Sequence, residues 1–478
     1  MSRLALQVVT IALVAASGRA ADAKWTSMFD GRTLSGWRAA EHPASFAVAD
    51  GAIRARGPRA HLFYVGDGDA SFSDFELRLE VNSRAGANSG IYFHTRWQEA
   101  GWPDRGYEAQ IDNTHVAEDG RAGPIRTGSL YGVRNLVRSP VSDDTWFTYL
   151  IRVEANRIQL RVDGTLVVDY VEPENPARSD GHRGRRLSAG TFALQSHDPD
   201  SEVRFRSIEV RELPARAARF PPPYDPELDA RITALHERGF PVADLHVHLN
   251  GGLTTEQAEE ASRLYGISHG IAVNCGLNFP IDSDEELNAF VDAYRQPLQT
   301  YLGLQAEGRE WTGFVASETR ERFDYVFTDA MTWTDDGGHR MRLWIPEEVR
   351  VGDPEAFMEQ LVSRIEGILR EPIDVYVNPT YLPEQLADRY DALWTSERAD
   401  RVIRALAASG VALEISDSLR LPKPDFIRKA RAAGIPLTCG TNNRGRELGH
   451  IGYCIEMIEE CGLTPEDMWL PGKRGARE

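Results

Sequence analysis

The sequence predicts an all-β sandwich or jelly roll followed by an α/β barrel-like domain. Apolar and polar residues alternate in short runs through residues 24–213, as they do in half-buried strands. Three consecutive prolines at 221–223 then force an extended segment that neither a helix nor a central strand can contain. After residue 232, short apolar runs alternate with amphipathic helical patterns, which is typical of a parallel sheet with crossover helices.

The N-terminus has the pattern of a secretory signal peptide over residues 1–23. Arg3 precedes an apolar run over 4–16, and Ala-Asp-Ala at 21–23 supplies a cleavage-site pattern. The run is too short for an ordinary transmembrane helix, and no later stretch reaches membrane length. We therefore expect a secreted or periplasmic protein without a membrane span.

Composition narrows the function classes. The 478 residues suit two or three domains, and 42% of them are hydrophobic, which suffices for sizeable cores. The formal net charge of −18 argues against a nucleic-acid partner, because such proteins need a basic face. The four cysteines contain no Cys-x-x-Cys pair, so we expect neither a disulfide framework nor a structural zinc knuckle.

Three local patterns define the β domain. Residues 75–81 alternate strictly, and residues 158–168 read as two alternating runs around Asp163-Gly164, which is the signal of a tight hairpin. Residues 203–210 alternate with one slip in phase, which predicts a β-bulge. Together these runs predict a sandwich.

The region over 214–231 is the predicted Pro-rich linker, and the α/β domain is expected over 232–472. Thr254 and Gln257 form a capping-box pattern, and Asp353-Pro354 opens a second amphipathic helix. Polar residues follow the strand candidates, at the edge where barrel enzymes gather their active sites. The strand candidates are 242–249, 270–275, 324–331, 374–379, 411–416 and 435–440.

The stretch Gly106–Asp112 (GYEAQID) carries the sharpest polar pattern of the β domain. Strand alternation places Glu108, Gln110 and Asp112 on one face, and the apolar residues between them on the other. Two carboxylates and an amide on one face could bind a cation, or hold a sugar and move a proton. They could equally form the solvated outer face of a sandwich.

Several stretches of this domain together resemble the 3-keto-disaccharide hydrolase domain family. The resemblance implies a concanavalin-like jelly roll whose concave face binds a carbohydrate substrate. It also implies an enzyme that cleaves glycosides whose C3 hydroxyl has been oxidised to a ketone. The matching stretches are Trp25, MFDGRTLSGW at 28–37, NSGIYF at 88–93, YEAQID at 107–112, GSLY at 128–131 and LQSH at 194–197.

The resemblance also implies a site. A carboxylate or histidine removes the proton at C2, the C1 substituent leaves by elimination, and water then adds. We expect a catalytic role for Glu108, Asp112 and His197, with Glu108 or His197 as the base. Many family members carry arginine where this sequence has His94, with Arg96 two residues on. The substrate-binding residues expected are His94, Arg96, Gln110, Tyr131 and Gln195.

The stretch Asp244-Leu245-His246-Val247-His248 opens the α/β domain with two histidines on one strand face, a spacing that can hold one metal ion or two. It resembles the first motif of the polymerase-and-histidinol-phosphatase (PHP) family, whose distorted α/β barrel hydrolyses phosphoesters with two or three metals. The resemblance covers roughly residues 240–470. Asparagine stands at several later ligand positions, 274, 378 and 442. A reduced site could hold a single divalent metal through His246, His248, Glu307, Asp329 and Glu414.

Two other interpretations of this domain stay open, a cleft that binds a ligand without metal and a purely structural domain. Three functions follow for the whole chain. The leading one is a secreted carbohydrate-active enzyme that cleaves 3-keto-glycosides in its β domain. The second is a metal-dependent PHP-type phosphoesterase with a glycan-binding β domain, and the third is a non-catalytic glycan-binding protein. We expect no nucleotide cofactor.

Overall fold

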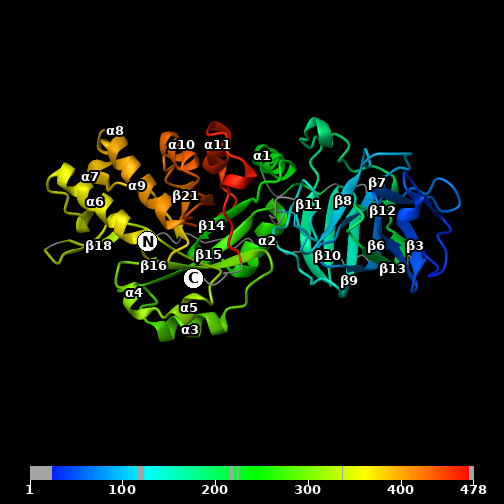
Figure 1. Ribbon diagram of the computed structural model, residues 1–478, viewed down its shortest axis with the longest axis horizontal. Coiled ribbons are helices and arrows are strands. Elements are labelled where there is room, and N and C mark those ends of the chain that lie inside the picture. The colour runs from blue at the N-terminus through cyan, green and yellow to red at the C-terminus, as the bar shows by residue number, and fades with distance from the viewer. Residues whose placement is uncertain are drawn as a thin grey trace, which may run out of the picture.

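The computed structural model describes residues 24–116, 123, 125–215, 220–222, 225–335 and 337–472. Two domains lie side by side along the long axis, a β sandwich coloured from blue through cyan to green and an α/β domain coloured from green to red (Figure 1). The predicted signal peptide falls on residues 1–23, outside the described residues, and stays a prediction. Among the described helices, none combines the length and the apolar character needed to span a membrane.

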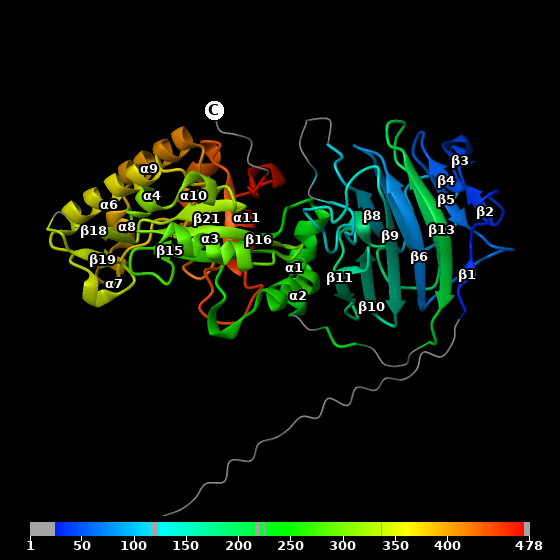
Figure 2. The same ribbon diagram turned by 90° about the horizontal axis from the view of Figure 1, so that it is seen from below.

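The first domain is a sandwich of two antiparallel sheets, and Figure 2 shows the strands of the larger sheet side by side. The larger sheet runs in the order β11 (Thr165–Val171), β10 (Arg157–Val162), β9 (Trp146–Glu154), β6 (Phe75–Ser83), β13 (Val203–Glu212), β4 (Ala52–Ala55) and β3 (Phe46–Ala49), with β1 (Thr26–Ser27) paired to β13. The smaller sheet runs in the order β2 (Trp37–Ala39), β5 (Ala60–Tyr64), β12 (Thr191–Ser196), β7 (Asn88–Thr95) and β8 (Tyr107–Asp112).

The local patterns of the β domain are confirmed. Strands β10 and β11 form the hairpin around Asp163 and Gly164, whose positive φ angles of 46° and 77° suit a tight turn. The phase slip in β13 is a break in register between Arg206 and Glu209. In β8, Tyr107 and the other apolar residues pack into the core between the sheets, so the polar residues of that strand face away from it.

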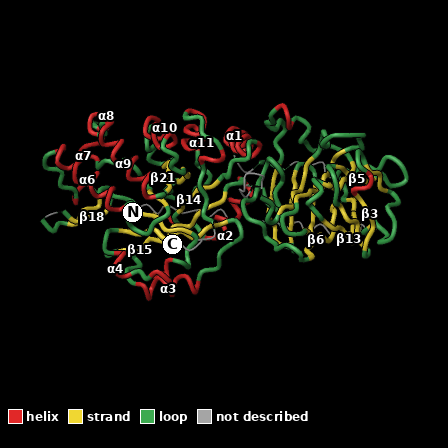
Figure 3. The backbone as a smooth tube through the Cα atoms, viewed as in Figure 1, coloured by secondary structure: helices red, strands yellow, loops and turns green. Residues whose placement is uncertain are grey.

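The second domain is built on seven parallel strands, and helices surround them (Figure 3). The last strand lies beside the first, where the Asn442 N–H donates to the His246 carbonyl at 2.8 Å, so the sheet nearly closes into a barrel. The strands, in order, are β14 (Ala243–Val247), β15 (Ser268–Gly276), β16 (Thr300–Glu307), β17 (Tyr325–Thr328), β20 (Val375–Tyr376), β21 (Ala412–Ser416) and β22 (Leu437–Gly440). A separate hairpin pairs β18 (Thr332–Thr334) with β19 (Arg340–Arg342).

The helices of this domain begin where the sequence places their signals. Thr254 and Gln257 make the predicted capping box at the start of α2, and Asp353 caps α6 ahead of Pro354. The helices are α1 (Pro226–Glu237), α2 (Thr255–Tyr265), α3 (Asp284–Ala293), α4 (Trp311–Phe314), α5 (Ser317–Arg320), α6 (Pro354–Ile368), α7 (Glu384–Ala387), α8 (Tyr390–Leu393), α9 (Ser396–Ser409), α10 (Pro424–Ala432) and α11 (Gly452–Glu460).

Two features differ from the predicted elements. Helix α1 begins at Pro226, inside the predicted linker over 214–231, because Asp225 caps it through the Glu227 N–H. Strand β16 is absent from the predicted strands, because Gly303 and Gln305 interrupt its apolar run although every residue of it is buried.

A buried ion pair joins the two domains. Arg134 of the sandwich lies 2.5 Å from Asp229 of α1, with side-chain exposures of 1% and 6%. The Arg134 Nε also donates to the Leu264 carbonyl at 2.8 Å, and the Asn135 amide donates to the His236 carbonyl at 3.0 Å. Directional bonds between buried groups therefore fix how the domains meet.

Replacing Asp229 by alanine should lower the free energy of unfolding by about 3 kcal/mol, because the Arg134 charge would stay buried without its carboxylate. The matched control is Glu460→Ala, which removes a surface partner of Arg428 and should change stability by less than about 1 kcal/mol. Urea unfolding followed by circular dichroism measures both. Equal effects of the two variants would contradict the assigned role of the Arg134–Asp229 pair.

Candidate active site

A cavity of about 400 Å³ opens on the outer face of the smaller sheet. Strands β7, β8 and β12 supply its floor, and the loops 102–106 and 181–185 supply its walls. Five of the side chains predicted for the site line it: Glu108, Gln110, Tyr131, Gln195 and His197.

Glu108 is the buried carboxylate of this cavity and is only 5% exposed. Its Oε1 accepts a hydrogen bond of 3.1 Å from the Gln195 amide, which also lies 3.1 Å from the Tyr92 hydroxyl. Burial raises the pKa of Glu108, while the nearby Arg185 guanidinium and the hydrogen bonds of Tyr92 and Gln195 act in the opposite direction. The result is a carboxylate that holds a proton more readily than an exposed glutamate does.

A glycine makes room for this carboxylate. Gly90 of β7 lies opposite Gln110 of β8, two pairs along from the Tyr92–Glu108 pair and on the same face of the sheet. A β-carbon at position 90 would overlap the Glu108 carboxyl group. The glycine of the NSGIYF stretch is therefore required for the position of Glu108.

His197 stands at the rim of the cavity with 32% of its side chain exposed. Its Nδ1 lies 2.7 Å from Asp198 Oδ2, and Asp198 is held in turn by the backbone N–H and hydroxyl of Ser201. A proton on Nδ1 satisfies the carboxylate, so Nε2 is the nitrogen that can exchange a proton with a ligand. The His197 ring lies 5.8 Å from the Trp102 ring across the opening.

The positive charges of the cavity were missed by the sequence analysis. Arg185 donates to the Tyr131 carbonyl and lies 4.6 Å over the Tyr131 ring. Arg105 also lines the cavity, and its buried Nε has no hydrogen-bond partner among the described residues. Both come from loops without a motif, whereas Tyr92, also missed, belongs to the NSGIYF stretch.

Comparison with known proteins agrees with this geometry. Residues 24–211 match the model of the 3-keto-alpha-glucoside-1,2-lyase-like domain family. The first domain belongs to this family. The match supports a carbohydrate-active enzyme of glycoside hydrolase type, and it does not extend to the second domain, whose resemblance to the PHP family stays a prediction.

Similar solved structures cover the same part of the chain. A "putative glycosyl hydrolase" from Parabacteroides distasonis is 20% identical, with 40% of this chain and 94% of that chain covered and a TM-score of 0.34. The carbohydrate-binding module CBM66 from Bacillus subtilis is 18% identical, with 37% and 96% covered and a TM-score of 0.27. No curated protein matches the sequence.

Two residues predicted to bind substrate lie outside the cavity of the lyase-like domain. His94 is buried, its Nε2 donates to the Ser73 carbonyl at 2.8 Å, and its Nδ1 accepts from the Ser188 N–H at 3.2 Å. Burial lowers the pKa of His94 to about 4, so it is a neutral structural group. Arg96 is exposed and pairs at 2.5 Å with Asp104, which lines the cavity while Arg96 does not. Neither residue lines the cavity, and the role in substrate binding expected for each stays a prediction.

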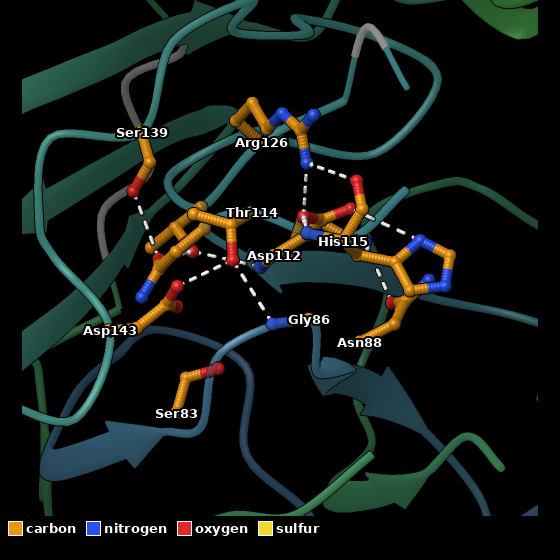
Figure 4. A network of polar contacts seen from close by, with 12 residues as sticks. Ser83, Gly86, Asn88, Asp112, Thr114, His115, Arg126, Ser139 and Asp143 are labelled. Atoms are coloured by element: carbon orange, nitrogen blue, oxygen red, sulfur yellow. Dashed lines mark hydrogen bonds and ion pairs between the residues drawn. The ribbon is translucent and has the colours of Figure 1, made fainter. Parts of the chain in front are cut away.

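Asp112 also lies outside the cavity lining. It forms an ion pair with the buried Arg126 and accepts the His115 N–H at 3.0 Å (Figure 4). In the same network, Thr114 contacts the Gly86 N–H and the Asp143 carboxylate. These contacts anchor the loop that follows β8, and the catalytic role expected for Asp112 stays a prediction.

In the second domain, His246 lies at the centre of a hydrogen-bonded chain. Its Nδ1 donates to Glu414 Oε1 at 2.7 Å, and its Nε2 donates to Gln305 Oε1 at 3.3 Å. The Gln305 amide then donates to Glu307 Oε1 at 3.1 Å. Burial acts to lower the pKa of His246, but the carboxylates of Glu414, Asp244 and Asp329 raise it above the ordinary value.

These bonds do not fit the predicted metal site. A metal ligand must offer a lone pair, and both nitrogens of His246 face oxygen acceptors. Among the described residues, no group of three or more His, Cys, Asp or Glu side chains is arranged to hold a metal ion. Glu307 and Asp329 instead accept from the side-chain amides of Asn274 and Asn378 at 3.0 and 2.9 Å. The metal assignment to His246, His248, Glu307, Asp329 and Glu414 stays a prediction that this donor set does not support.

Replacing Arg185 by methionine should raise the pKa of Glu108 further, because a nearby positive charge that lowers it would be lost. Carboxyl-carbon NMR of the labelled protein measures this titration, and in the unaltered protein the pKa should already exceed the ordinary value of 4.5. Arg183→Met is the matched control, since Arg183 lies on the same loop and pairs with the exposed Asp180. The arrangement described here would be wrong if Arg185→Met left the Glu108 titration unchanged.

Proposed function

We propose that the lyase-like domain cleaves glycosides whose C3 carries a ketone, by removal of the C2 proton, elimination of the C1 substituent and addition of water. The observation that carries the proposal is Glu108, a buried carboxylate of raised pKa at the floor of a cavity. The family match supports a carbohydrate-active enzyme, and the specificity for the 3-keto substrate is our proposal.

Glu108 suits the role of base because of its surroundings. A ketone at C3 acidifies the neighbouring C2–H, so a carboxylate can remove that proton. A carboxylate of raised pKa is a stronger base, and proton transfer is most effective when the pKa lies near the working pH. Burial raises the pKa of Glu108, and the positive charge of Arg185 acts to lower it. Arg185 thereby favours the ionised form of Glu108, which is the form that can take a proton.

The other cavity residues fit the remaining charges of the reaction. Proton removal leaves negative charge on the C3 oxygen, and Arg185 and Arg105 supply positive charge in the cavity walls. The leaving oxygen at C1 needs a proton, which the His197 Nε2 at the rim would donate while Asp198 holds the ring. We place the base at Glu108 and the acid at His197 because Glu108 is buried on the floor and His197 faces solvent.

Glu108→Gln should lower kcat on a 4-nitrophenyl 3-keto-α-glucoside by about 10²- to 10⁴-fold, since the amide cannot take the C2 proton. Release of nitrophenol measures the rate. Deuterium at C2 of the substrate should slow the unaltered enzyme, because the C2–H bond breaks in the reaction. Glu209→Gln, on the larger sheet, is the control and should retain activity.

Two results would overturn the proposal. One is equal cleavage of the unoxidised 4-nitrophenyl α-glucoside, because that substrate has no acidified C2 proton. The other is a Glu108→Gln variant that binds the 3-keto substrate and cleaves it at the normal rate.

Gly90→Ala should lower kcat/KM at least tenfold, because the new β-carbon would displace the Glu108 carboxyl group. The order of magnitude follows from the sensitivity of catalysis to displacements of about 1 Å. Gly68→Ala is the matched control, since a β-carbon there meets no atom within 4 Å. Full activity of Gly90→Ala would show that Glu108 need not occupy this position.

A further inference from the structure

A second cavity, of about 360 Å³, lies at the carboxyl ends of the parallel strands in the α/β domain. His248 follows β14, Asp329 follows β17, and Asn442 follows β22, so strands far apart in the sequence contribute to one lining. This edge of a parallel barrel is where binding sites form, because the loops there can vary without disturbing the core. None of its lining residues belongs to the lyase-like domain.

Side-chain amides dominate the polar lining, and each offers both a donor and an acceptor. The side-chain amide of Asn274 donates to the Glu307 carboxyl group, and that of Asn378 donates to the Asp329 carboxyl group. The side-chain amide of Asn442 donates to the side-chain oxygen of Asn378 at 3.0 Å. These bonds fix the orientation of the amides before any ligand arrives. A row of fixed donors and acceptors matches a ligand with many hydroxyl groups, each of which also donates and accepts.

Aromatic side chains supply the other half of a sugar site. Phe279, Trp344 and Tyr381 line the same cavity, and Trp344 is 39% exposed. A large exposed apolar side chain beside a polar cavity points to a binding surface. A pyranose ring presents C–H groups on one face and hydroxyls at its edge, so it can pack on an aromatic ring while its hydroxyls reach the amides.

The charges of the lining favour a neutral ligand. Glu307 and Asp329 both contribute carboxylates, and Arg444 is the one lysine or arginine among the described residues of the lining. A phosphate would face the oxygen atoms of the Glu307 and Asp329 carboxyl groups, and metal ions usually offset such repulsion in phosphate sites. Both ring nitrogens of His246, a predicted metal ligand, already contact side-chain oxygen atoms, of Glu414 at 2.7 Å and of Gln305 at 3.3 Å.

We propose that this cavity is a second carbohydrate site, which binds a neutral sugar through amides and aromatic rings and needs no metal ion. The inference does not depend on the reaction proposed for the lyase-like domain. It gives the α/β domain a binding function in place of metal-dependent phosphoester hydrolysis.

The test is calorimetric titration of the full chain, treated with a chelator, with D-glucose and methyl α-D-glucopyranoside. We expect binding that Trp344→Ala and Asn274→Ala each weaken at least tenfold, while Trp344→Phe, which keeps an aromatic ring, stays within about threefold, given about 1.4 kcal/mol per tenfold change. Trp146→Ala is the matched control, since Trp146 is a similarly exposed tryptophan on the larger sheet. Thermal unfolding checks that each variant is folded.

Either of two outcomes overturns the inference. The first is that neither sugar binds, or that binding is unaffected by both Trp344→Ala and Asn274→Ala. The second is hydrolysis of 4-nitrophenyl phosphate that needs added Mn²⁺ or Zn²⁺ and is lost in His246→Ala. Cleavage of the 3-keto-glycoside by the same Trp344 and Asn274 variants is measured in parallel, so failure of one proposal does not decide the other.

Discussion

The burial of the Glu108 carboxylate is the constraint on which the arrangement of the first site depends. A charged group on a buried sheet face is unfavourable unless polar partners replace water around it. Gln195 supplies the hydrogen bond, Arg185 supplies the opposing charge, and Gly90 supplies the space. These residues come from two strands and one loop, and each is explained by the needs of one carboxyl group.

The α/β domain meets the same constraint with neutral partners. Glu307 and Asp329 are buried at neighbouring strand ends, and burial raises the pKa of both. Side-chain amides donate hydrogen bonds to both carboxyl groups, and the Arg309 guanidinium also acts to lower both pKa values. The second carboxylate further raises the pKa of Glu307, to about 8. The two domains therefore differ in the ligands they can accept: the first cavity has guanidinium groups to receive developing negative charge, whereas the second offers chiefly dipoles.

Local patterns predicted the fold well because they depend on neighbours in sequence. The hairpin at Asp163-Gly164 and the capping box at Thr254 need only a few residues, and alternation correctly turned Glu108 away from the core. The same rule could not show that Glu108 lines the cavity while Asp112 does not. Alternation predicts which face of the strand a side chain is on, but it does not predict how far along that face the cavity extends. Arg185 could not be predicted, since its place beside Glu108 depends on how a distant loop folds back over the sheet.

That loop is held by the other domain. The Ser179 N–H donates to Glu237 Oε2 at 3.0 Å, and His182, which lines the first cavity, lies 3.7 Å from Glu237 Oε1. Glu237 ends α1, the helix that also carries Asp229 of the buried interdomain ion pair. One helix of the α/β domain thus supports the loop that brings Arg185 to Glu108. The family match ends at residue 211, but contacts from residues beyond that point hold one wall of its cavity in place, so the α/β domain supports the first site from outside.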